Sequence, residues 1–111
     1  MIYKTTAAAY ELARRRAEIS KIRYEYAKAD PSRFTDKDMD QLKKEMNDDE
    51  IELQDIQDQL KTDIAKIKDV LARRIAYDHY LVGMTVSELA KHYNFSNSSI
   101  KRYLRMARRS E

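Results

Sequence analysis

Hydrophobic positions in the first part of the chain recur with the period of an α-helix. The larger apolar residues between positions 6 and 29 are Leu12, Ile19, Ile22 and Tyr26, at spacings of 7, 3 and 4. Residues at these spacings share one face of a helix, which Arg15 interrupts. The pattern predicts a helix over residues 6–29. A turn is expected over residues 30–34, because the residue before Pro31 avoids helical torsions.

A longer stripe of apolar residues follows Thr35 and Asp38, which are spaced as a helix start. Its members are Met39, Leu42, Met46, Leu53, Ile56 and Leu60, and then Ile64, Ile67, Leu71 and Ile75. The first six fall on a heptad pattern, and the later steps shift its phase. We expect one helix of about 40 residues, roughly 60 Å long, with its weakest point at the polar residues 47–50. The stripe is expected to pack against the first helix or against a second copy of the chain.

The stretch from residue 84 to residue 109 has the local signals of a helix-turn-helix. Thr85 and Glu88 have the spacing of a capping box, which marks the start of a helix. Asn94 stands where the backbone often turns left-handed after a helix, and Ser96 can cap the next helix. Ala90 is small, as is needed where the two helices approach each other closely.

The register of the apolar residues supports this interpretation. A helix-turn-helix unit numbered from Val86 expects apolar residues at the positions of Leu89, Tyr93, Phe95, Ile100 and Tyr103, and all five comply. Gly83, the only glycine of the chain, is expected to end the preceding helix. The unit is therefore predicted to have three helices, over residues 71–82, 86–93 and 97–108.

Composition agrees with a helical fold. The 111 residues contain one Gly and one Pro, and no segment alternates apolar and polar residues as a half-buried strand does. The expected fold class is all-α. A long helical hairpin or coiled-coil region would be followed by a C-terminal three-helix domain.

Charge is distributed unevenly along the chain. Residues 1–34 carry 8 Lys and Arg against 4 Asp and Glu, residues 35–72 carry 6 against 12, and residues 73–111 carry 8 against 3, within a net charge of +3. A phosphate backbone attracts the basic ends and repels the acidic middle. The distribution therefore indicates double-stranded DNA as the partner of the C-terminal domain.

The expected outward face of the last helix carries groups that contact DNA in other proteins. Asn97 and Ser98 stand at its N-terminal end, the part of a recognition helix that enters the major groove. Lys101, Arg102 and Arg105 suit phosphate or guanine contacts. The candidate DNA-binding residues are Ser96, Asn97, Ser98, Lys101, Arg102 and Arg105.

These observations assign a task to each part of the chain. Residues 1–70 are interpreted as a helical or coiled-coil region for self-association, through which a homodimer is expected. Residues 71–111 are interpreted as the DNA-binding domain, with the helix over residues 97–108 in the major groove.

Other function classes are not expected. The chain has no Cys, and His79 and His92 lack the neighbouring ligands of a metal site. No Gly-rich phosphate loop or nucleophile motif occurs, so neither an enzyme nor a cofactor is expected. No apolar run approaches the roughly 20 residues that span a membrane, and the lack of Cys suits a reducing compartment. We expect a cytoplasmic protein.

Two segments of the C-terminal third carry a resemblance to known proteins. LVGMTVSELA at residues 81–90 and FSNSSIKR at residues 95–102 are similar to region 4 of sigma factors. The chain resembles more closely the phage regulators of the RinA and ArpU late-gene activator kind. Asn94 departs from the Gly that is usual there. The resemblance implies transcriptional control of phage or mobile-element genes, with RNA polymerase as a further partner.

Two alternative functions fit the same residues. A protein-interaction module of this kind would bind RNA polymerase or another host protein. A DNA packaging subunit similar to small terminases would also combine a helix-turn-helix with an oligomerising helical region, although that class usually carries the motif at its N-terminus.

Overall fold

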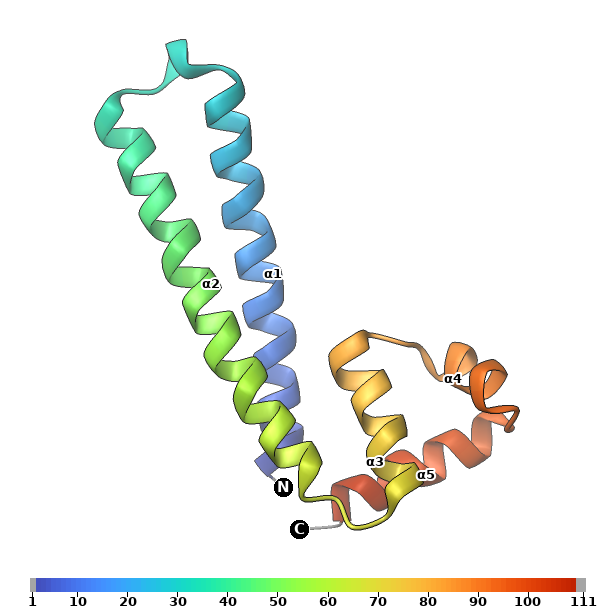
Figure 1. Cartoon of the computed structure of the whole chain (residues 1–111). Helices are drawn as coiled ribbons and strands as arrows, with labels where there is room; N and C mark the ends of the chain where they lie inside the picture. Colours follow the sequence, from blue (N-terminus) through green and yellow to red (C-terminus); the bar gives the residue numbers. More distant parts are fainter. Residues whose placement is uncertain (1, 110–111) are drawn as a thin grey trace. The chain divides into compact units, whose positions relative to one another are not determined.

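The computed structural model describes residues 2–109, with side chains from residue 6 onward (Figure 1). Its elements are α1 (Ile2–Ala29), η1 (Pro31–Arg33), α2 (Asp36–Ala65), α3 (Val70–Tyr77), η2 (Asp78–Val82), α4 (Val86–Tyr93) and α5 (Asn97–Arg109). No strand occurs between residues 2 and 109, so the all-α prediction is confirmed. The expected ranges 1–70 and 71–111 include residues 1, 110 and 111, which lie outside the described part.

The chain divides into two compact units. One unit comprises residues 8–56, and the other comprises residues 1–7 together with residues 57–111. The predicted domain boundary after residue 70 lies inside the second unit, at the start of α3.

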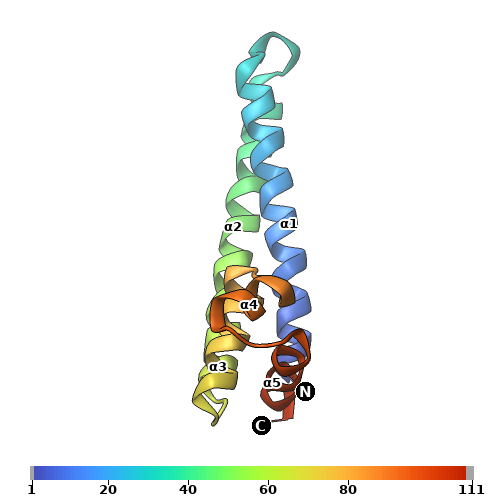
Figure 2. The same cartoon turned by 90° about the vertical axis from the view of Figure 1, so that its right-hand side faces the viewer.

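Residues 8–56 form a helical hairpin, in which α1 and α2 lie side by side in both views (Figures 1 and 2). The turn between them begins at Asp30, whose carboxylate accepts a hydrogen bond from Ser32 Oγ at 2.7 Å and pairs with Arg33 at 3.1 Å. Thr35 and Asp38 then form a capping box, because each backbone N–H donates to the other's side chain at 3.1 Å. The predicted turn and the predicted start of the second helix are both confirmed.

The face that α1 buries is not the one that carries its large apolar residues. Leu12 and Ile19, from the stripe of large apolar residues, are each 51% exposed. The buried face of α1 consists of Tyr10 and of small side chains, which are Thr6, Ala7, Ala13, Ala17, Ser20 and Ala27. Small residues let two helices approach closely, so that large residues on the partner helix fill the space between them. The helix predicted from the large residues is confirmed, but those residues do not form the packing face of this hairpin.

The large residues between the helices come from α2. Met39, Leu42, Met46, Leu53 and Ile56 are half-buried, and Leu60 is buried, as the heptad pattern predicted. Asp49 occupies the remaining heptad position, and its carboxylate accepts a hydrogen bond from the Ser20 hydroxyl of α1. Thr6 donates in the same way to Asp63 at 3.0 Å. Each pair is separated from the other by fourteen residues on both helices (6 to 20 and 49 to 63), so both belong to one antiparallel register.

The single helix of about 40 residues is divided in the structure. α2 runs without a break through residues 47–50 and ends at Ala65, and α3 begins at Val70. The side chain of Asp69 caps α3 by accepting from the N–H of Ala72 at 2.8 Å. Arg73 also donates to the carbonyl of Ile67 at 3.2 Å. The break expected at residues 47–50 was therefore wrong. Asp49 bonds to Ser20 of α1 within an unbroken α2, whereas Asp69 is the N-cap at the actual break.

The three C-terminal helices surround a small apolar core. Its buried members are Ile75 of α3, Leu89 and Ala90 of α4, and Ile100 and Leu104 of α5. α3 and α4 both pack against α5. The core holds α5 by its apolar side, so that its opposite side remains at the surface.

We predict that Ala13→Leu destabilises the hairpin. Ala13 is 3% exposed, and an added side chain in a packed interface costs about 1–3 kcal/mol. Ala8→Leu is the matched control, because Ala8 lies on the same helix but is exposed; it should change stability by no more than about 0.5 kcal/mol. Denaturant unfolding followed by circular dichroism measures both. Equal stability of the two variants would contradict the buried small-residue face.

Candidate nucleic-acid interface

The turn between α4 and α5 is built by local hydrogen bonds that the sequence predicted. The Thr85 hydroxyl accepts from the N–H of Glu88, and the Glu88 carboxylate accepts from the N–H of Thr85, both at 3.2 Å. Asn94 adopts a left-handed conformation, with φ 59° and ψ 45°. Ser96 Oγ accepts from the N–H of Ser99 at 3.1 Å. The capping box, the left-handed residue and the cap of the second helix are thereby confirmed.

A second set of contacts ties α4 to the helix before it. η2 is a π-helical turn that follows α3, and it ends at Gly83 with φ 90°. The Tyr93 hydroxyl donates to the Asp78 carboxylate at 2.5 Å. His79 Nδ1 donates to the carbonyl of Met84 at 2.7 Å. These bonds attach the last residue of α4 and the segment just before α4 to η2, and they show His79 in a structural role.

The candidate DNA-binding residues lie together on the exposed side of α5 and at its start. All six are exposed, namely Ser96, Asn97, Ser98, Lys101, Arg102 and Arg105. Five of them recur at spacings of one and three residues, which places them on one face of the helix. The hydroxyl of Ser96 also donates to Ser99 Oγ at 3.0 Å, so it serves the turn as well. Their roles in DNA binding remain predictions.

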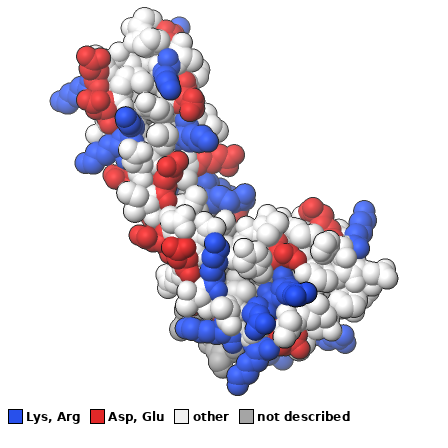
Figure 3. Space-filling view, viewed as in Figure 1, with Lys and Arg blue, Asp and Glu red and all other residues white. Residues whose placement is uncertain are grey.

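The electrostatic character of α5 is uniformly basic. Its 13 residues include five Lys and Arg and no Asp or Glu. Figure 3 shows Lys and Arg gathered over the C-terminal helices, whereas both signs are interspersed over the hairpin. Arg102, Arg105, Met106 and Arg109 line a surface depression on this helix. Such a face attracts a polyanion and repels a basic partner.

A row of aromatic residues lies beside this face. Phe95, at which the helix-turn-helix register expects an apolar residue, is 36% exposed. It is stacked between Tyr93 and Tyr103, with ring centroids 6.4 Å and 5.7 Å away. The Arg102 guanidinium lies 5.7 Å from the centroid of the Tyr103 ring, within cation–π range. The row of rings covers the edge of the core, and it connects that core to one of the candidate arginines.

Two other kinds of site have no counterpart among the described residues. Within the described part of the chain, no group of three or more His, Asp or Glu is arranged to hold a metal ion. No helix among residues 2–109 is both long enough and apolar enough to cross a membrane.

The similarity of this chain to a protein family is not confined to the C-terminal helices. The ECF sigma factor family matches residues 7–110. The chain belongs to the ECF sigma factor family. Family membership supports the predicted region-4-like helix-turn-helix and assigns this sigma-family chain, at a coarse level, to DNA-binding regulation of transcription. No curated protein and no solved structure matches the chain.

The family match also covers the hairpin, for which the sequence offered no motif. The sequence resemblance rested on the helix-turn-helix alone, because capping residues and turn residues occur there at fixed offsets. The hydrogen bond between Tyr93 and Asp78 was likewise not foreseen. Its partners are 15 residues apart in different elements, and no local pattern connects them.

We predict that the Tyr93 phenol in this sigma-family chain loses its proton at a higher pH than an ordinary tyrosine. Burial of the phenol, aided by its hydrogen bond to Asp78, raises the pKa of Tyr93 to about 12, above the ordinary value of about 10. The folded state therefore keeps a proton that the unfolded state loses. The resulting stability is present below about pH 10 and is lost as the pH rises through about 12.

The difference in alkaline absorbance between the wild-type chain and Tyr93→Phe isolates this phenol from the seven other tyrosines. A difference titration centred near pH 10 would show that the buried bond to Asp78 is not formed.

Proposed function

We propose that this chain is a sequence-specific DNA-binding regulator of transcription, with α5 as the recognition helix in the major groove. The observation that carries the proposal is the two-sided character of α5. Ile100, Leu104 and Ala107 are buried against the other helices, while a set of mainly polar and basic groups faces outward. A recognition helix needs this arrangement, because one side must be held rigidly while the other meets base edges.

Two sets of residues on α5 would make different kinds of contact with DNA. Lys101, Arg102 and Arg105 would bind phosphates or guanines, while Asn97 and Ser98 at the first turn of α5 would meet base edges. The capped turn before α5 supports this division, since the bonds of Ser96 and the left-handed Asn94 position the start of the helix. The likeness to late-gene activators supports a regulator of phage or mobile-element type.

We predict that Lys101→Ala combined with Arg102→Ala weakens DNA binding steeply. If both side chains contact phosphate, the slope of log K against log salt falls by about 0.9 for each lost contact on B-form DNA. Binding to a duplex selected from random sequences, measured by fluorescence anisotropy at several salt concentrations, gives both the affinity and the slope.

Lys43→Ala combined with Lys44→Ala is the matched control, because it removes the same charge from exposed positions of α2. An equal loss of affinity in the control would show that total charge, and not the face of α5, attracts DNA. If the wild-type chain binds no duplex even at low salt, the alternative of a module that binds RNA polymerase or another host protein replaces this proposal.

We predict that Asn97→Ala changes sequence preference and leaves the salt dependence unchanged. An Asn that pairs with adenine discriminates against other bases by about 1–3 kcal/mol, whereas it releases no counterions. Repeating the selection from random DNA with the variant should relax one base position. An unchanged preference together with a lower salt slope would contradict the assignment of Asn97 to base reading.

A further inference from the structure

The outer face of α1 exposes a row of large apolar side chains. Leu12 and Ile19 are each 51% exposed, and Ile22 and Tyr26 are 61% and 64% exposed. α1 buries its small residues against α2, so this row lies on the side of α1 that α2 does not cover. Contiguous exposed apolar surface on a soluble protein commonly marks an interaction site.

The row has the spacing of a coiled-coil seam. Leu12, Arg15, Ile19, Ile22 and Tyr26 follow one another at intervals of 3, 4, 3 and 4 residues, which is the a/d pattern of a heptad repeat. We call these five residues the α1 seam. Leu12, Ile19 and Tyr26 occupy its a positions, and Arg15 and Ile22 occupy its d positions.

Charged residues of opposite sign border the two edges of the α1 seam. Glu11 and Glu18 occupy the g positions on one edge, and Arg16 and Arg23 occupy the e positions on the other. In a parallel pair of helices each g residue faces the e residue five places later in the partner. Glu11 would then face Arg16, and Glu18 would face Arg23, in both directions across the pair.

We propose that the α1 seam is the self-association surface of this protein and that its occupant is the α1 seam of a second copy in parallel orientation. A parallel pair places opposite charges together at every one of these edge positions. An antiparallel pair places g residues against g residues and e residues against e residues, so that Glu would meet Glu and Arg would meet Arg. Like charges at such short range repel each other, so the pattern selects the parallel arrangement.

This dimer differs from the one that the sequence suggested. The heptad stripe of α2 had motivated self-association, but in the structure that stripe faces α1 of the same chain. The α1 seam is more exposed than the α2 stripe, and its two charged edges are complementary to each other. A surface that complements itself fits a second copy of the chain better than it fits an unrelated partner.

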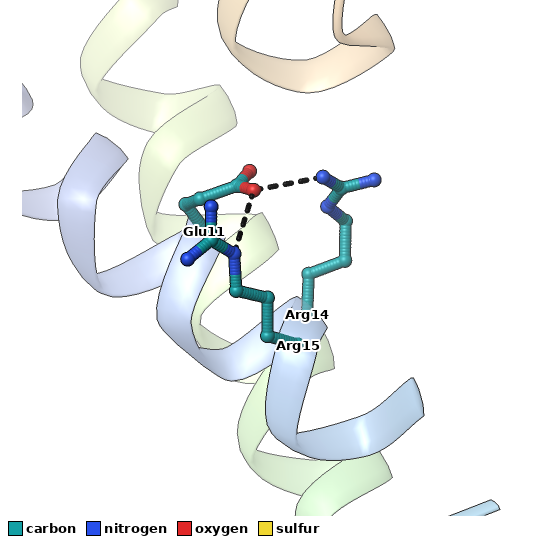
Figure 4. A network of polar contacts seen from close by, with 3 residues as sticks. All are labelled: Glu11, Arg14 and Arg15. Carbon is teal, nitrogen blue, oxygen red and sulfur yellow. Dashed lines mark hydrogen bonds and ion pairs between the residues drawn. The ribbon is translucent and has the colours of Figure 1, made fainter. Parts of the chain in front are cut away.

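Arg15 is the one charged residue within the α1 seam, and the structure shows how its charge is accommodated. Glu11 Oε1 lies 2.8 Å from Arg14 Nη2 and 3.4 Å from Arg15 Nε (Figure 4). The hydrogen bond from Arg14, with further help from Arg15, lowers the pKa of Glu11. A single polar residue at a core position of a coiled coil specifies register while it weakens association.

The parallel arrangement has a consequence for DNA binding that rests on the proposed function. Thr6 of α1 is bonded to Asp63 of α2, two residues before α2 ends. In a parallel dimer both copies carry this pair at the same end, so both chains leave α2 toward their C-terminal helices there. Two recognition helices tethered at one end suit two half-sites on one duplex, a helical turn or a multiple of it apart.

Sedimentation equilibrium of the full chain without DNA tests the association itself. We predict a concentration-dependent dimer, whose dissociation constant rises at least tenfold in Ile19→Lys. Ile51→Lys is the matched control, because Ile51 is 62% exposed but lies on α2 outside the α1 seam; it should leave the dissociation constant unchanged. A wild-type chain that stays monomeric at high concentration overturns the proposal, as does equal weakening by both variants.

Two charge variants and their mixture test the parallel orientation. Glu18→Arg and Arg23→Glu each place like charges together in a parallel homodimer, so each should associate more weakly than the wild-type chain. Mixing the two variants should restore association, because every g and e pair is again of opposite sign. In an antiparallel dimer Glu18 already faces a Glu and Arg23 already faces an Arg of the partner, so neither single change adds a repulsion. Unchanged or stronger association of the single variants therefore overturns the parallel arrangement.

Disulfide formation gives an independent measurement, because the natural chain contains no cysteine. Tyr26→Cys lies near one end of the α1 seam, so it faces its own counterpart only in a parallel, in-register pair. We expect it to form disulfide-linked dimers under mild oxidation much faster than Ile51→Cys. Equal rates overturn the proposal. Because none of these measurements uses DNA, a failure here is distinct from a failure of DNA binding.

Discussion

The close approach of α1 to α2 through small side chains is the constraint on which the other features of the hairpin depend. Ala13 and Ala17 leave room for large residues of α2, such as Leu53 and Ile56. Because the small face of α1 is used in this way, the large residues of the same helix remain outside. The hairpin therefore satisfies its own packing with one face of α1 and presents a second apolar face to its surroundings.

Polar contacts give the hairpin a definite register, which apolar packing alone specifies weakly. The bonds of Ser20 to Asp49 and of Thr6 to Asp63 repeat after two heptads on each helix. Sliding one helix along the other would leave these carboxylates at the interface without their partners, which is costly for partly buried charged groups. The same register determines that the start of α1 lies beside the end of α2. The residues of the α1 seam thus acquire a defined place along the hairpin.

One side of α5 is buried and keeps the helix in place, while the opposite side is exposed and can meet a partner. Leu89, Ile100 and Leu104 make a core that immobilises one side of the helix, and the turn at Asn94 and Ser96 determines where the helix begins. The basic side is left free of acidic residues from its own helix. Under the proposed function, this separation would present the outward groups to DNA in a reproducible position.

The sequence by itself determined the features that arise from interactions between near neighbours. The capping box of Thr85 and Glu88, the left-handed Asn94 and the exposed side of α5 were all predicted, since capping and helical periodicity act within a few residues. Only the tertiary structure decided which face of α1 is buried, where the long helix ends, and that Tyr93 bonds to Asp78. The reason is physical: Ala and Ser form a packing face only when a partner supplies complementary large residues. Likewise, whether Asp49 or Asp69 begins a new helix depends on which of them has a distant hydrogen-bond donor. Hydrophobicity marks the residues that gain most from burial, but the shape of the partner decides which of them are buried.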